Sequence, residues 1–245
     1  METKNILVAD EWLSQRLNKP VFSLPTTKFL SENLFRLKQE LQAVPLMAYA
    51  KVSVQKTVEG MMLQDMGFRV IDTQVEMQRP LRTFDALPTS VVPIRWALDS
   101  DRDEVVSLAA ESFHVSRFHL DPLIDNKQAD QIKKGWAESF FLNQRGDEMI
   151  LACEGKSIIG FASLIKLEDS LRIDLIAVKE SHRGKQIAEE MMTFAEYQFG
   201  SWFEGRPMLS VGVQLANSSS LALYQRMGFT IRESLYVMHI HQDDV

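Results

Sequence analysis

Cysteine and long apolar runs are the scarcest features of this 245-residue sequence. The single cysteine, Cys153, excludes a disulfide framework and any zinc or iron–sulfur site built from several cysteines. No run approaches the roughly 18 apolar residues that a membrane-spanning helix needs, and the first residues, 1–4, have no apolar signal segment. We therefore expect a soluble, cytoplasmic protein in which Cys153 is a buried strand residue.

Positive charge is also in short supply. Lys and Arg total 27 against 33 Asp and Glu, which gives a net charge of −6 and a pI of about 5.5. This balance argues against a dedicated nucleic-acid-binding protein, although a local basic patch still suits a small anion. The mass of 28.0 kDa predicts one to two domains, each able to bury a core.

Prolines mark a change of pattern between two parts of the chain. Pro80, Pro88 and Pro93 punctuate a polar, aperiodic stretch, so we place a linker near residues 80–90, between an N-terminal part (1–85) and a C-terminal part (91–245). In the C-terminal part, apolar patterns predict strands at 91–96, 148–154, 157–166, 171–179, 208–213 and 229–239, with helices from 99 and over 126–142, 184–197 and 218–227. This order predicts an α+β fold with a mixed, mostly antiparallel sheet flanked by helices.

The two parts of the chain share a short pattern. Leu63–Phe68 precedes Tyr224–Phe229 by 161 residues (228 − 67), and Gln, Met, Gly and Phe coincide at that offset. Met77 and Met238 coincide as well. Either the N-terminal part is a partial copy of the C-terminal part, or two helices happen to end on the same glycine cap. In a true repeat, Leu63 stands where the C-terminal part has Tyr224.

The strongest chemical signal is an apolar strand that runs into a basic turn. Ile173–Val178 is followed by Arg183–Ala188, which opens a helix, and cationic side chains surround the turn at Lys179, His182, Arg183 and Lys185. Amides at a helix N-terminus and nearby positive charge together favour a phosphate group. The alternative is an ordinary solvated loop.

A second signal follows in the next helix. Asn217 begins it, Tyr224 lies two turns later on the same face, and Gly228 ends it. A phenol has an ordinary pKa of about 10, above that of a thiol, so Tyr224 is able to donate a proton to a departing thiolate. The alternative for Tyr224 alone is core packing.

Together the two motifs resemble the GNAT superfamily of acyl-CoA N-acyltransferases over about residues 91–239. The resemblance implies an acetyl-CoA cofactor and a GNAT fold, preceded by a partial GNAT-like copy without the catalytic tyrosine. It assigns the cofactor to Ile176, Val178, Arg183, Gly184, Lys185, Gln186, Ile187, Ala188 and Asn217, and the general acid to Tyr224. The family usually has glycine where this chain has Gln186, which keeps the amide but restricts the turn.

The loop at residues 116–122, with Trp136 beyond it, is similar to the acceptor loop of sugar-nucleotide acetyltransferases in that superfamily. The implied substrate is the amino group of a nucleotide-linked amino sugar, which attacks the thioester directly, so no protein nucleophile is needed. Arg117, His119 and Asp121 are the candidate acceptor-binding residues, and Arg117 suits a phosphate unless it forms a surface salt bridge.

The residue that removes the amine proton is not identified by the sequence. Asp174, expected on one strand face with Ile176 and Val178, is a candidate beside His119, Asp121 and a water relay. The amides near Ile176 and Val178 are expected to polarise the acetyl carbonyl. A GNAT that acetylates a peptide or protein α-amine and a non-catalytic acyl-CoA-binding module are the competing functions.

His239 and His241 alternate on the last predicted strand, so both rings face one side, as in a zinc site. Because the sequence indicates no third ligand, we predict no metal. The resemblance makes a homodimer an additional expectation, and a membrane or nucleic-acid partner is not expected.

Overall fold

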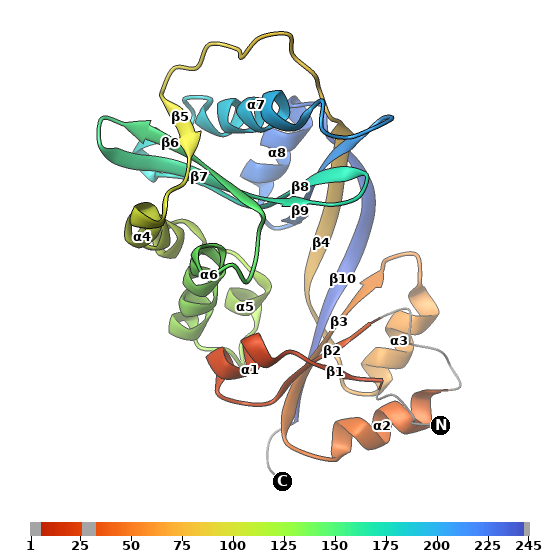
Figure 1. Ribbon diagram of the computed structural model, residues 1–245. Coiled ribbons are helices and arrows are strands. Elements are labelled where there is room, and N and C mark those ends of the chain that lie inside the picture. Colours follow the sequence, from red (N-terminus) through yellow and green to blue (C-terminus); the bar gives the residue numbers. More distant parts are fainter. Residues whose placement is uncertain (1–5, 26–32, 243–245) are drawn as a thin grey trace.

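One mixed sheet runs through the residues that the structure, a computed structural model, describes: 6–25 and 33–242 (Figure 1). Its strands are β1 (Val8–Ala9), β2 (Val21–Leu24), β3 (Leu46–Ser53), β4 (Arg69–Pro80), β5 (Ile94–Trp96), β6 (Glu148–Glu154), β7 (Ser157–Lys166), β8 (Ser170–Val178), β9 (Met208–Gln214) and β10 (Thr230–Gln242). The α-helices are α1 (Glu11–Leu17), α2 (Leu34–Gln42), α3 (Thr57–Asp65), α4 (Arg102–Ser112), α5 (Arg117–Leu120), α6 (Asn126–Phe141), α7 (Ile187–Phe199) and α8 (Ser218–Arg226). None of the described helices is both long and apolar enough to span a bilayer.

The strand order is β1-β2-β3-β10-β4-β9-β8-β7-β6-β5, and only the β2–β3 and β8–β9 pairs among these strands are parallel. This confirms the predicted α+β class and its mixed, mostly antiparallel sheet. Helices α7 and α8 pack on one face with α2 and α3, and α1, α4, α5 and α6 cover the other face (Figure 1). Cys153 is buried in the core under α4 and α6.

The predicted repeat has a counterpart in the pairing of the strands. β3 pairs with β10 with Ser53 opposite Leu235, and β9 pairs with β4 with Gln214 opposite Gln74. The differences 214 − 53 and 235 − 74 both equal 161, the offset of the sequence match. The two parts therefore use the same register, but each supplies its last strand to the other, so β4 lies between β10 and β9. The division at residues 85 and 91 stays a prediction.

The helix ends of the repeat also correspond. Phe68 N donates to Leu63 O at 3.0 Å, and Phe229 N donates to Tyr224 O at 2.9 Å. Gly67 and Gly228 have φ values of +102° and +82°, the left-handed conformation that glycine adopts without strain. Leu63 and Tyr224 therefore occupy equivalent places, and Leu63 is fully buried in the core under α2 and α3.

β8 and β9 pair only at their first halves. The last pair is Ile173 with Val211, after which β9 continues along β4 and β8 continues along β7 as far as Val178. The β7–β8 register also shifts, because Leu164 faces Ile173 while the preceding Ser163 faces Leu175. Asp174 is thus an extra residue in a β-bulge at the point where the two strands separate.

Candidate active site

The separation of β8 from β9 leaves one edge of β8 unpaired by a strand over residues 174–178. Lys179 N donates to Ile159 O of β7 at 2.8 Å, so the amides of residues 177 and 175 also point toward β7. The amides of Ile176 and Val178 alternate with them and point into the opening between β8 and β9. Two backbone donors are therefore directed at one small region; their predicted role toward an acetyl carbonyl stays a prediction.

Asp174 does not share a strand face with Ile176 and Val178, so that prediction is wrong. The bulge turns the Asp174 carboxylate toward the face under α6, where Arg145 binds it through two hydrogen bonds of 2.6 Å each. Ile176 and Val178 pack against the opposite core, under α7 and α8. The alternation of β8 gives no sign of the bulge, because a single inserted residue inverts the faces of all later residues.

The basic turn between β8 and α7 has the geometry of an anion cradle. Gly184 has a φ of +77° and Gln186 a φ of +62°, so α7 begins at Ile187 and not at Gly184 as predicted. Glu190 N donates to Gln186 O, which leaves the amides of residues 187–189 without an intrahelical acceptor. Among the described residues no side chain caps this end.

The cations around this turn differ in their availability. Lys179, Arg183 and Lys185 are exposed. Arg183 Nε donates to Val178 O at 3.1 Å, which ties the turn to the end of β8. His182 lies 3.1 Å from a Glu154 carboxylate oxygen and is the least available of the four.

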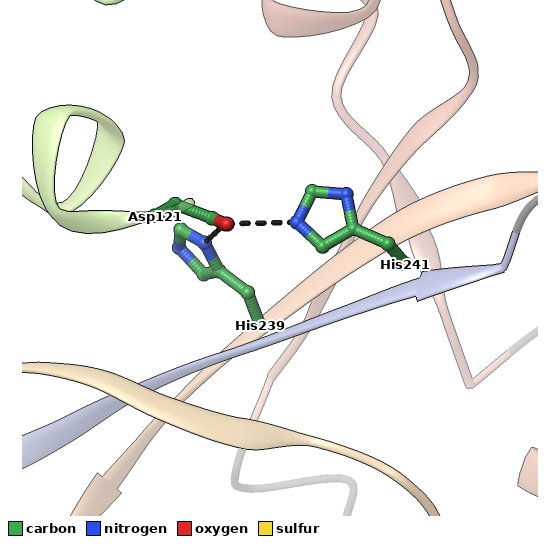
Figure 2. Close-up of side chains that lie close together, drawn as sticks. All are labelled: Asp121, His239 and His241. Carbon is green, nitrogen blue, oxygen red and sulfur yellow. Dashed lines mark hydrogen bonds and ion pairs between the residues drawn. The ribbon is translucent and has the colours of Figure 1, made fainter. Parts of the chain in front are cut away.

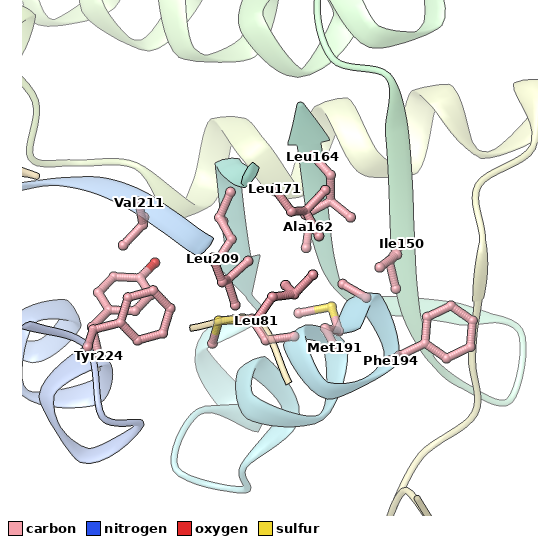
Figure 3. Packing of buried hydrophobic residues seen from close by; sticks show 14 of the residues in the cluster. Leu81, Ile150, Ala162, Leu164, Leu171, Met191, Phe194, Leu209, Val211 and Tyr224 are labelled. Atoms are coloured by element: carbon pink, nitrogen blue, oxygen red, sulfur yellow. The ribbon is translucent and has the colours of Figure 1, made fainter. Parts of the chain in front are cut away.

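Tyr224 lies on α8 in the core beneath β9, beside Val211 and Phe229 (Figure 3). Figure 3 shows its hydroxyl oxygen on the side of β9. The residue is 3% exposed, and burial raises the pKa of its hydroxyl well above the usual value. Tyr224 therefore stays protonated at neutral pH, as a proton donor must. Asn217 caps α8 by accepting from Ser220 N at 3.2 Å, which uses its carbonyl oxygen.

A cavity of about 250 Å³ lies on the other face of the sheet, where both parts of the chain meet. Its lining residues are Asp10, Trp12, Leu13, Tyr49, Arg117, Phe118, Trp136, Ser139, Gln144 and Arg145. Arg145 links the cavity to the strand opening through Asp174. The combination of aromatic rings, guanidinium groups and an amide suits a polar ligand that carries a ring and negative charge.

Arg117 is placed in this cavity by α5. Its guanidinium carbon lies 4.0 Å from the centre of the Tyr49 ring, and Tyr49 Oη donates to Asp10 at 2.9 Å. Its Nη1 atom is buried and has no hydrogen-bond partner among the described residues. Within the part of the chain that the structure describes, Arg117 thus forms no salt bridge, and one of its donors is available to a ligand.

His119 and Asp121 are close to Arg117 in the chain but are not among the cavity-lining residues. His119 bonds to Ser116 Oγ at 2.7 Å and to Asp130 at 3.0 Å. Asp121 is buried, and its Oδ2 accepts from His239 at 2.6 Å and from His241 at 2.8 Å (Figure 2). Neither His119 nor Asp121 therefore faces the cavity as predicted. Their hydrogen bonds instead hold α5, and with it Arg117, against α6 and β10.

Asp121 is the third potential metal ligand that the sequence did not reveal, and the three ligand atoms lie within 4.8 Å of one another. Two features favour a hydrogen-bonded network over a metal centre. The distances of 2.6 and 2.8 Å are those of hydrogen bonds. Lys19 also lies 2.8 Å from Nδ1 of His241, where a metal-bound imidazole would carry a proton and need an acceptor.

Other residues around the cavity were missed by sequence reasoning. Trp12 and Tyr49 come from the N-terminal part, and Trp12 stacks on Trp136 with ring centres 6.2 Å apart. Lys133 on α6 places its amine 4.1 Å from the centre of the Trp136 ring. No local motif marks these residues, because the sheet brings them together from distant segments.

The family model described as "Acetyltransferase (GNAT) family" matches residues 104–229, which include the bulge, the basic turn and Tyr224. The chain belongs to the GNAT acetyltransferase family. This confirms the resemblance inferred from the two motifs, and it makes the protein an acetyltransferase.

Two relatives are named for polysaccharide biosynthesis and for the acetylation of dTDP-fucosamine. The chain is 32% identical over 140 residues to the spore coat polysaccharide biosynthesis protein SpsD of Bacillus subtilis; the match covers 57% of this chain and about half, 47%, of that protein. It is 24% identical over 192 residues to the dTDP-fucosamine acetyltransferase of Escherichia coli, covering 78% of this chain and 80% of that one. A GCN5-related N-acetyltransferase from Sphaerobacter thermophilus shares the fold, with a TM-score of 0.61 at 13% identity, covering 97% and 76% of the two chains.

The strain at Gln186 leads to a stability prediction. A non-glycine residue in the left-handed region costs about 1–2 kcal/mol in the folded state. Glycine removes this cost, but it also gives the unfolded chain more conformational entropy, which offsets part of the gain in stability. We expect Gln186→Gly to raise the free energy of unfolding by about 0.5–1 kcal/mol, measured by urea denaturation. Gly184→Ala is the matched control and should lower it, although its added Cβ would meet no atom within 4 Å. A loss of stability in Gln186→Gly would contradict the strain.

The Asp121–His239–His241 network leads to a pH prediction. Burial lowers the pKa of His239 to about 4, although Asp121 opposes this, while hydrogen bonds from both histidines outweigh the burial of Asp121 and hold its pKa below the usual value. In the unfolded chain His239 titrates near 6.5, so the unfolded chain binds this proton first as the pH falls. The free energy of unfolding should therefore decrease from pH 6.5 to 4, by as much as ~2–3 kcal/mol from His239.

Urea denaturation across this pH range tests the network. His239→Asn should flatten the dependence on pH. The exposed His114 provides the control, because His114→Asn should retain the wild-type dependence. Equal slopes in all three proteins would refute the assignment to His239.

Proposed function

We propose that this acetyltransferase transfers the acetyl group of acetyl-CoA to the amino group of a nucleotide-linked amino sugar, such as a 4-amino-4,6-dideoxyhexose. The observation that carries the proposal is the cavity with the buried, unpartnered Arg117 Nη1, on the sheet face opposite Tyr224. The names of the two relatives support the same substrate class. A homodimer and a cytoplasmic location stay predictions.

The residues of the basic turn fit acetyl-CoA. The free amides of residues 187–189, the exposed Lys185 and the turn at Gly184 suit its pyrophosphate. Asn217 has an amide nitrogen left for the pantetheine arm, since only its oxygen caps α8. When bound, the cofactor supplies the acetyl group as a thioester.

The chain's own groups then have separate tasks. The amides of Ile176 and Val178 hydrogen-bond the acetyl carbonyl oxygen, where negative charge develops. Tyr224 donates its proton to the departing sulfur from the α8 side. Asp174 lies at the fork of the strands on the cavity side, so we propose it as the acceptor of the amine proton, with Arg145 orienting its carboxylate. Holding the amine against the thioester supplies much of the remaining rate.

Release of CoA thiol in the presence of candidate acceptors tests the substrate class. Purified protein with acetyl-CoA should release thiol with one or more amino-sugar nucleotides and not with the same nucleotides lacking the amine. If peptides react and no amino-sugar nucleotide does, the substrate assignment is wrong. If neither class reacts although acetyl-CoA binds, the chain is an acyl-CoA-binding module.

The role of Tyr224 gives a separate prediction. Tyr224→Phe keeps the ring in its buried site and removes the proton, so kcat should fall by about 100-fold while the affinity for acetyl-CoA stays unchanged. Tyr197→Phe, on α7, is the matched control and should retain wild-type turnover. Unchanged turnover in Tyr224→Phe would refute the general-acid role.

A further inference from the structure

The sheet face under α5 and α6 carries more charge than the cavity residues alone. The charged side chains that interact there are Asp10, Lys51, Asp72, Glu76, Arg117, Lys133, Arg145, Arg172 and Asp174. Arg145 is neutralised by Asp174, and Arg172 by Glu76 through hydrogen bonds of 2.8 and 3.1 Å. Three cations, Lys51, Arg117 and Lys133, have no carboxylate bound to them in the described part of the chain.

The two carboxylates that are left, Asp10 and Asp72, offset only part of the charge of these three cations. Asp10 is engaged by Tyr49 Oη at 2.9 Å and by Leu13 N at 2.9 Å. Asp72 is 7% exposed and accepts from Thr73 N at 2.7 Å. Three cations therefore face two carboxylates that also have other partners. Arg117 lines the cavity, Lys133 lies against the ring of the cavity-lining Trp136, and Lys51 follows the cavity-lining Tyr49 by two residues on β3.

Lys133 is the most unusual of the three cations. It is 6% exposed, and its amine has no hydrogen bond or ion pair within the described chain. The rings of Trp136 and Phe113 lie close to this amine, with centres at 4.1 and 5.4 Å. The side chain is almost fully buried, but its amine nitrogen keeps some exposure and is therefore open to a ligand.

We propose that Arg117, Lys133 and Lys51 form a subsite for the phosphate groups of the acceptor, with Lys51 contributed by the N-terminal part of the chain. This inference rests on the proposed function, which places a nucleotide-linked sugar in the cavity. It gives the catalytically empty N-terminal part a task in recognition: Tyr49 orients Arg117, and Lys51, on the same strand β3, adds charge at the open side of the subsite. The buried Arg117 Nη1 is the donor that the phosphate would use.

The subsite couples ligand binding to proton uptake. Burial, and next the charge of Arg117, lowers the pKa of the Lys133 amine to about 7. Asp174 raises this pKa, whereas Arg145 and Lys51 lower it. A bound dianion raises the pKa of Lys133, so binding at pH 8 must take up protons, and affinity must fall as the pH rises above 7.

Titration calorimetry with dTDP tests this in the intact protein, with thymidine as the uncharged control. Measurements at pH 8 in Hepes and in Tris give the number of protons taken up from the difference in enthalpy. We expect dTDP to bind with proton uptake and thymidine to bind at least tenfold more weakly. Saturating CoA should leave dTDP binding in place, because the basic turn at α7 is a separate anion site.

Variants distinguish a phosphate subsite from a structural role of the lysine. Lys133→Met, close in shape and uncharged, should bind dTDP about tenfold more weakly at pH 7. Lys133→Arg keeps a permanent charge and should retain binding at pH 8.5 with less proton uptake. Lys51→Met should weaken binding, and Lys156→Met, at the exposed β6–β7 turn, should not.

The outcomes separate this inference from the proposed function. If dTDP binds wild type and Lys133→Met equally, or without proton uptake, the subsite is refuted even where an amino-sugar nucleotide is acetylated. If dTDP binds as expected and no amino-sugar nucleotide is acetylated, the subsite stands and the proposed reaction is wrong. If dTDP does not bind at all, the subsite is refuted.

Discussion

The separation of β8 from β9 after Ile173 and Val211 is the constraint on which the rest of the site depends. Paired strands consume their edge amides, so a sheet offers backbone donors to a ligand only where pairing stops. Here β9 stays with β4, and the bulge at Asp174 bends β8 away. One extra residue thereby leaves the amides of Ile176 and Val178 without a strand partner on the side of β9.

The groups to which we assign different tasks in the proposed reaction lie on different faces of the sheet. Tyr224 belongs to the core under α7 and α8, where burial keeps its proton in place. Arg117 and Arg145 lie on the opposite face, under α5 and α6. In the proposed reaction, the amine approaches the open edge of β8 from the cavity side, opposite the face that carries Tyr224. The exchange of β4 and β10 between the two parts of the chain places strands of both parts beneath both regions.

Features encoded within a short segment were predictable from the sequence. The helix over 126–141, the meander of β6 to β8 and the glycine-capped end of α8 follow from local periodicity and local caps. The start of α7 was placed three residues early, because glutamine gives no sign of the left-handed conformation that Gln186 adopts. The face of Asp174 was wrong because a bulge is a property of two strands. The contact of Asp121 with His239 spans 118 residues, and no local pattern reports such a pair.

The charged groups under α6 are not explained by a contribution to the stability of the fold alone. The network of Asp121 with His239 and His241 holds α5 through short hydrogen bonds, although Nε2 of His239 is itself buried without a partner among the described residues. Arg117 Nη1 is likewise buried without a partner, but unlike His239 it belongs to a residue that lines the cavity. Leaving a buried donor unpaired costs free energy, and an anion bound in the cavity would give this donor a partner.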